Sequence, residues 1–115
     1  MTKTAHRWIP VILSLFLISC GSPANRLNQK ALDALGQDNV PQAVSLLEKA
    51  SRLDPQSPEI FYNLSEAYRR QGQMEQALEA IQKAVQLAPN DGEFVATRAK
   101  LRLFSGQASE ALVEL

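Results

Sequence analysis

Apolar positions recur along most of this chain at the spacing of an α-helix. Between residues 74 and 87 they fall at Ala77, Leu78, Ile81, Ala84 and Val85. Steps of three and four residues place these side chains on one face of a helix, where a neighbouring helix can bury them. This pattern and the capping signals between segments predict helices near residues 25–36, 41–53, 59–71, 74–87, 93–105 and 108–115. The sequence therefore predicts an all-α fold.

Polar residues, glycine and proline mark the boundaries of these helices. Ser57 precedes Pro58, a capping hydroxyl followed by a proline at the first helical position. Asn90 and Asp91 offer a similar cap for the fifth helix. Gly72 stands where a left-handed residue would close a helix, and Pro89 prevents the preceding helix from continuing. These signals predict short turns between paired helices.

The helical pattern repeats along the chain at a constant offset. Asn39–Pro55 (NVPQAVSLLEKASRLDP) aligns without a gap with Gln73–Pro89 (QMEQALEAIQKAVQLAP). The matching pairs are Ala43 with Ala77, Leu47 with Ile81, Lys49 with Lys83, Ala50 with Ala84, Leu53 with Leu87, and Pro55 with Pro89. A fixed period of about 34 residues indicates a stacked array of one supersecondary unit.

The repeat resembles the tetratricopeptide repeat (TPR), an antiparallel helix-turn-helix unit that stacks into an α-solenoid. The residues that carry the resemblance are Phe61, Leu64, Ser65, Tyr68, Gly72, Ala77, Ile81, Ala84, Leu87 and Pro89. The array would occupy residues 25–115, with units near 24–57 and 58–91 and an incomplete unit at 92–115. Lys30 and Arg98 replace Leu64 in the outer units, which leaves the rotation of those helices open.

Residues 1–19 have the layout of a secretory signal peptide. Lys3, His6 and Arg7 form a positively charged start, and the apolar run Trp8–Ile18 follows. This run is too short to cross a hydrocarbon core, which needs about 20 residues. We therefore expect the chain to be exported.

Cys20 is the single cysteine, so an internal disulfide is excluded. The residues that end at it, LISC, resemble the lipobox of bacterial lipoproteins. This resemblance implies cleavage after Ser19 and lipidation of Cys20, with a diacylglyceryl thioether and fatty acyl groups such as palmitate. Several acyl chains would hold the protein stably on a membrane. Gly21, in place of a retaining Asp, favours the outer membrane of a Gram-negative cell. A secreted protein with an incidental cysteine is the alternative.

Composition argues against two classes of function. The 12 basic and 12 acidic residues give a net charge of zero, so a nucleic-acid partner, which requires a basic patch, is not expected. The chain beyond Cys20 holds no further cysteine and no histidine, which leaves Cys/His catalysis and the usual zinc ligand sets without their residues. The prediction is a non-enzymatic protein without a metal or cofactor.

Resemblance to TPR arrays implies a concave groove, lined by the first helix of each unit, that holds a peptide or helix of a partner protein. The residues it places in that groove are Glu59, Tyr62, Asn63, Glu66, Arg69 and Arg70. Tyr62 is the expected anchor, because aromatic residues often dominate interfaces. Arg69 and Arg70 have an alternative role, since cations also stabilise the carboxyl end of a helix.

A carboxylate clamp of the kind that some TPR domains use is not expected here. The corresponding positions hold Asn28, Leu32, Asn63, Glu93 and Thr97, and only Asn63 matches. Glu93 would repel a carboxylate ligand.

The expected function is a lipid-anchored TPR adaptor or scaffold of the bacterial envelope, assisting assembly of a secretion, pilus or cell-wall complex. Only Gly21 to Ala24 would separate Cys20 from the array, which would keep the array close to the membrane. The third unit stops at Leu115, inside its second helix, so we expect a longer native chain or self-association. Two alternatives stay open: the N-terminal part of an envelope enzyme whose catalytic domain follows residue 115, and a spacer without a specific ligand.

Overall fold

A computed structural model describes residues 21–106, which form helices and turns without a strand. The helices of this part are α2 (Pro23–Gly36), α3 (Val40–Leu53), α4 (Pro58–Arg70), α5 (Met74–Leu87) and α6 (Gly92–Phe104). The predicted all-α fold is confirmed for these residues. The signal segment, Cys20 and the helix expected at 108–115 lie outside the described residues.

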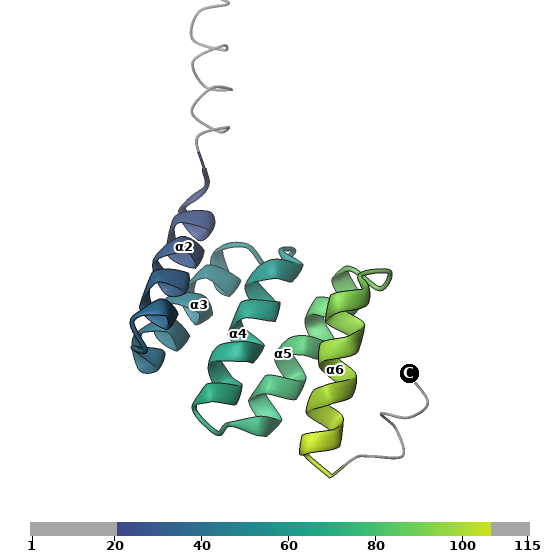
Figure 1. The fold of residues 1–115 in the computed structure, drawn as a ribbon. Coiled ribbons are helices and arrows are strands. Elements are labelled where there is room, and N and C mark those ends of the chain that lie inside the picture. Colours follow the sequence, from purple (N-terminus) through teal and green to yellow (C-terminus); the bar gives the residue numbers. More distant parts are fainter. Residues whose placement is uncertain (1–20, 107–115) are drawn as a thin grey trace, which may run out of the picture.

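Consecutive helices pack against one another as stacked hairpins (Figure 1). Helix α2 pairs with α3, and α4 pairs with α5. The hairpins are joined by packing of α3 on α4, and α6 packs on α5. Helices α2, α4 and α6 form a row at the front of Figure 1, with α3 and α5 behind them.

The helix starts differ slightly from the sequence prediction, and the caps explain why. Helix α2 begins at Pro23 rather than at residue 25, because the Ser22 Oγ accepts the Asn25 N–H at 3.1 Å and proline favours the first helical position. Of the two caps predicted for α6, Asp91 rather than Asn90 is the one used, accepting the N–H groups of Glu93 and Phe94. The hydroxyl expected to cap α4 does not do so, since the Ser57 side chain makes no capping hydrogen bond.

The turns that follow α2, α4 and α6 reuse one backbone geometry, once in each repeat unit. Asp38, Gly72 and Gly106 have φ angles of +59°, +79° and +89°. After α4, the Gln73 N–H donates to the Tyr68 carbonyl at 2.9 Å and the Gly72 N–H donates to the Arg69 carbonyl at 3.0 Å. This pair of bonds is the Schellman motif, which requires a left-handed residue at the Gly72 position. The expected role of Gly72 is confirmed.

The core is built from small residues at the repeat positions where helices cross. Ala31, Ser65 and Ala99 occupy the same position of successive units and are 0%, 0% and 1% exposed. In α6, the buried residues Phe94, Ala99 and Leu101 match Ile60, Ser65 and Ala67 of α4 by the repeat offset, so these two helices bury the same face. In α2 the positions that match Ile60, Leu64 and Ala67 are exposed, so only the small residue is shared.

Candidate functional site

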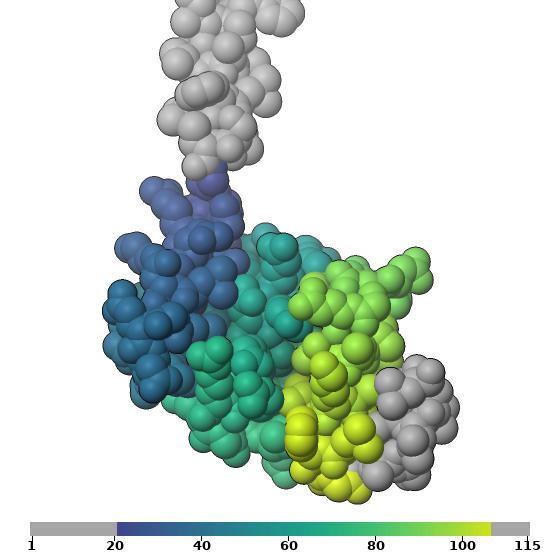
Figure 2. Space-filling model, in the orientation of Figure 1, coloured from purple at the N-terminus to yellow at the C-terminus, as the bar shows by residue number. Residues whose placement is uncertain are grey.

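Two hollows lie side by side along the row of α2, α4 and α6, and both include Tyr62. Figure 2 views the protein from this side, with a furrow between the teal surface of α4 and the yellow-green surface of α6. The first, which we call the Glu93 hollow, has a volume of about 330 Å³. It is lined by Asn28, Gln29, Leu32, Glu59, Tyr62, Asn63, Asp91, Glu93 and Phe94.

The second, which we call the Phe104 hollow, lies toward the carboxyl ends of α4 and α6 and has a volume of about 250 Å³. It is lined by Tyr62, Ser65, Glu66, Arg69, Thr97, Lys100, Leu101 and Phe104. Leu101 is buried, whereas the Phe104 side chain is 75% exposed. An aromatic ring left in water at the edge of a hollow is available to contact a ligand.

Tyr62 bridges α4 and α6 at the boundary of the two hollows. Its hydroxyl donates to the Glu93 Oε1 at 3.0 Å, and its ring lies 5.2 Å, centroid to centroid, from the ring of Phe94. Partial burial, followed by the bond to Glu93, raises the pKa of Tyr62 above its usual value. The side chain expected to anchor a ligand is thus already held in place by α6.

Asn28 and Asn63 join α2 to α4 at the floor of the Glu93 hollow. The Asn63 Nδ2 donates to the Asn28 Oδ1 at 2.9 Å, and Asn28 is only 4% exposed. A side-chain amide can donate twice through its nitrogen and accept twice through its oxygen. Each amide therefore keeps hydrogen-bonding capacity beyond this one bond, which suits recognition of a peptide backbone.

Glu66 holds both arginines of α4. The Arg69 Nε and Nη2 donate to its two carboxylate oxygens at 2.9 and 2.6 Å, and the Arg70 Nε donates to the Oε1 at 3.1 Å. The hydrogen bond from Arg69, with that from Arg70, lowers the pKa of Glu66 even though partial burial opposes the shift. The carboxylate therefore stays ionised and keeps Arg69 at the edge of the Phe104 hollow.

The structure brings together five of the six predicted groove residues. Glu59 and Asn63 line the Glu93 hollow, Glu66 and Arg69 line the Phe104 hollow, and Tyr62 belongs to both. Arg70 lines neither hollow. Its Nη1 donates to the Leu35 carbonyl at 3.3 Å, so it contacts the carboxyl end of the neighbouring helix α2.

The sequence analysis missed several residues of these hollows, notably Lys100 and Phe104. Both lie one repeat unit after groove positions that were predicted, Lys100 after Glu66 and Phe104 after Arg70. Applying the repeat offset to the groove positions would have identified them. Phe94, whose ring packs against that of Tyr62, directly follows Glu93 in the sequence. No sequence feature marked Phe94 itself as a groove residue.

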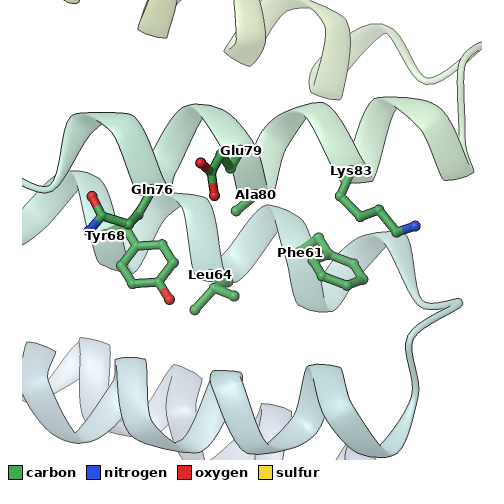
Figure 3. A pocket seen from close by; sticks show the side chains of 7 residues that line it. All are labelled: Phe61, Leu64, Tyr68, Gln76, Glu79, Ala80 and Lys83. Atoms are coloured by element: carbon green, nitrogen blue, oxygen red, sulfur yellow. The ribbon is translucent and has the colours of Figure 1, made fainter.

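Another hollow, of about 250 Å³, opens between α4 and α5 (Figure 3). Phe61, Leu64 and Tyr68 line it from α4, and Lys83 is among its lining residues on α5. The Tyr68 hydroxyl donates to the Glu48 Oε1 of α3 at 3.0 Å. Tyr68 thus links the two hairpins at this hollow, which is also lined by the exposed polar side chains of Gln76, Glu79 and Lys83.

The described residues also limit other kinds of site. Within residues 21–106, no group of three or more His, Cys, Asp or Glu side chains is placed to hold a metal ion. No helix in the same range has the length and apolar character needed to span a membrane.

Comparison with known proteins identifies the family. A family model described as tetratricopeptide repeat matches residues 34–101. The chain belongs to the tetratricopeptide repeat family. The match covers most of α3 to α6, and the helical hairpins described above are the units of the repeat.

Solved TPR structures have the same fold at low sequence identity. The TPR domain of Sgt2 from Aspergillus fumigatus superimposes with a TM-score of 0.75 at 21% identity, over 81% of this chain and 62% of that one. The first TPR domain of Spaghetti (RPAP3), bound to an HSP90 peptide, gives 0.75 at 23% identity, over 79% and 72%. The Yersinia enterocolitica type III secretion chaperone SycD, in complex with a peptide of the translocator YopD, gives 0.73 at 18% identity, over 77% and 68%. The chain thus spans less than two thirds of the Sgt2 domain.

Proposed function

We propose that this protein is a membrane-anchored TPR adaptor that holds a segment of a partner protein against α2, α4 and α6 at a bacterial envelope membrane. The observation that carries the proposal is the pair of hollows that meet at Tyr62. They combine exposed aromatic surface with polar groups on a rigid helical frame, as peptide-binding surfaces do. The proposal assigns the chain a binding role and no catalytic one.

The solved relatives support binding in a groove. The SycD and Spaghetti structures each contain a bound peptide, from YopD and from HSP90 respectively. The groove of the present chain differs from a carboxylate clamp, because Glu93 projects a negative charge where a clamp would hold a cation. The partner is therefore expected to use something other than a free carboxyl terminus at this position.

The membrane part of the proposal depends on lipidation of Cys20. Helix α2 begins at Pro23, so Gly21 and Ser22 alone would join the lipidated residue to the folded array. Three Cα–Cα steps from Cys20 to Pro23 reach at most about 11 Å. The array would lie against the membrane surface, which suits a partner embedded in or attached to the same membrane, such as a secretion, pilus or cell-wall complex. The outer membrane remains our expectation if the cell is Gram-negative.

The test is a crosslinking pull-down from membranes with the intact chain, compared with three variants. Cys20→Ser is expected to release the protein from the membrane fraction and to lose the partner. Tyr62→Ala combined with Arg69→Ala is expected to leave the protein on the membrane and still lose the partner. Lys49→Glu, on the exposed surface of α3, is the matched control and is expected to change neither result.

Two outcomes would contradict the proposal separately. If intact-mass analysis finds an unmodified thiol on Cys20, the proposed lipid anchor is contradicted. If the Tyr62→Ala, Arg69→Ala variant retains every crosslinked partner, binding in the groove is contradicted and a structural spacer is favoured.

A further inference from the structure

The two hollows of the groove have opposite charge. The Glu93 hollow is lined by the carboxylates of Glu59, Asp91 and Glu93 and by no lysine or arginine. The Phe104 hollow is lined by Arg69 and Lys100 against a single carboxylate, that of Glu66. Acidic residues near helix amino ends and basic residues near carboxyl ends agree with the helix dipoles, so this arrangement is stable without a ligand.

One charge at each end is available to a partner. Within residues 21–106, neither Glu59 nor Lys100 makes a side-chain hydrogen bond or an ion pair, and both are exposed. Arg69, by contrast, is held by Glu66 through two hydrogen bonds. A ligand therefore meets an unpaired negative charge at one end of the groove and an unpaired positive charge at the other.

The Phe104 hollow also has an apolar seat. The exposed ring of Phe104 stands beside the buried side chain of Leu101, and Lys100 lines the same space. An apolar ligand side chain placed there would cover an aromatic ring that is 75% exposed. A carboxylate next to that side chain would lie near the Lys100 ammonium group.

The length of the helices sets the spacing between these two features. Glu59 and Arg69 are ten residues apart on α4, or about 15 Å at 1.5 Å per residue, and Glu93 and Lys100 are seven apart on α6, or about 10 Å. An extended polypeptide covers such distances in about three to five residues.

We infer that the groove binds an extended segment of a partner protein with two charged positions of opposite sign. A Lys or Arg occupies the Glu93 hollow. A large apolar residue, next to an Asp or Glu, occupies the Phe104 hollow about three to five residues away. This inference rests on the proposed function, because it names the chemistry of the partner that the groove would hold.

The experiment is a selection from a random library of peptides of about nine residues, which extend to ~30 Å and so span both hollows. The immobilised target is the full chain, and each pool of bound peptides is sequenced. Parallel selections use Glu59→Lys and Lys100→Glu, each of which reverses one exposed charge that has no partner within the described residues. Circular dichroism checks that both variants keep the helical fold.

The matched control is Glu75→Lys, which reverses an exposed charge on α5 outside both hollows. It is expected to select the same peptides as the unaltered chain. Selected peptides should carry the basic and the apolar-acidic positions at the stated spacing. Glu59→Lys should remove the preference for a basic residue without creating one for an acidic residue, because Asp91 and Glu93 still line that hollow. Lys100→Glu should exchange the acidic position for a basic one.

Resynthesised peptides measure how much the charge pattern contributes to binding affinity. Reversing both charges of a selected peptide should weaken binding to the unaltered chain by about threefold to tenfold, because exposed ion pairs contribute modestly. Peptides that bind through Tyr62 but lack the charge pattern, or that ignore both charge reversals, overturn this inference and leave the proposed function standing. The selected peptides are also tested against Tyr62→Ala, and a selection in which no peptide loses binding to that variant overturns the proposed function itself.

Discussion

Most polar side chains on the α2–α4–α6 face already have a partner within the protein. Tyr62 bonds to Glu93, Asn63 to Asn28, and Arg69 to Glu66. These contacts fix the side chains in one rotamer before a ligand arrives, so less conformational entropy is lost on binding. A ligand would use the exposed ring faces and the remaining hydrogen-bonding capacity of these groups.

Tyr68, which lines the hollow between α4 and α5, makes the stability of the folded protein depend on pH in the alkaline range. Burial, and then the hydrogen bond to Glu48, raises the pKa of Tyr68 from 10.0 to about 12. Because the pKa of Tyr68 is higher in the folded state than in the unfolded state, the protonated side chain stabilises the fold fully below pH 10. This stabilisation is lost as the pH rises through about 12.

We therefore expect the unfolding free energy to fall between pH 10 and about 12, and to fall less steeply in Tyr68→Phe. Urea unfolding followed by circular dichroism across this range measures the slope. At neutral pH the variant should lose about 1 kcal/mol with the hydrogen bond to Glu48. Equal slopes for the two proteins would show that Tyr68 ionises normally in the folded state.

The helical hairpins themselves were predictable from the sequence because their signals are local. Apolar spacing gives the buried face of each helix, and proline, Asp91 and Gly72 mark its ends. Contacts between hairpins were not predictable in the same way. The bond between Asn63 and Asn28 joins residues 35 positions apart, and the loss of the Ser57 cap depends on side-chain orientation rather than on residue type.

The turn after α4 depends on glycine for its backbone alone. Gly72 has a φ of +79°, and a Cβ added there would meet no atom within 4 Å. Gly72→Ala should therefore destabilise the protein by about 1 kcal/mol through left-handed strain without any clash. Thermal and urea unfolding measure the difference.

Gly36 is the matched control, because it also has open space around it but lies in α2 with an ordinary helical backbone. Gly36→Ala should stabilise the protein by about 0.5–1 kcal/mol. Effects of the same sign at the two positions would contradict the assignment of Gly72 to a left-handed turn.

The hydrogen bond between Asn28 and Asn63 joins α2 to α4, and it predicts that the two hairpins are energetically coupled. Asn28→Ala removes a buried amide and leaves the Asn63 Nδ2 without its acceptor. A double-mutant cycle with Asn63→Ala should give a coupling energy of about 0.5–1.5 kcal/mol. A pairing of Asn63→Ala with Gln86→Ala, at an exposed position of α5, should give additive effects. Additivity of the Asn28 and Asn63 changes would mean that the bond contributes nothing to the joint.

Over the whole molecule, each TPR hairpin buries its apolar face only against its neighbours, so the ends of an array are its weak points. In α6, the neighbouring side chains of Leu103 and Phe104 are 44% and 75% exposed. Large apolar side chains exposed next to each other favour association with a second copy unless another segment covers them.

We expect the Cys20→Ser chain to self-associate through this exposed surface of α6, so that its melting temperature rises with protein concentration. Sedimentation velocity over a range of concentrations should show the same trend. Leu103→Lys should abolish both dependences while leaving Phe104 and the groove unchanged. Leu53→Lys, which places a charge at a comparably exposed leucine at the end of α3, should leave them intact. Leu53 and Leu103 are both exposed, so loss of association in Leu53→Lys alone would place the contact on the first hairpin instead. A sharp, concentration-independent melt of the unaltered chain would exclude self-association through either leucine.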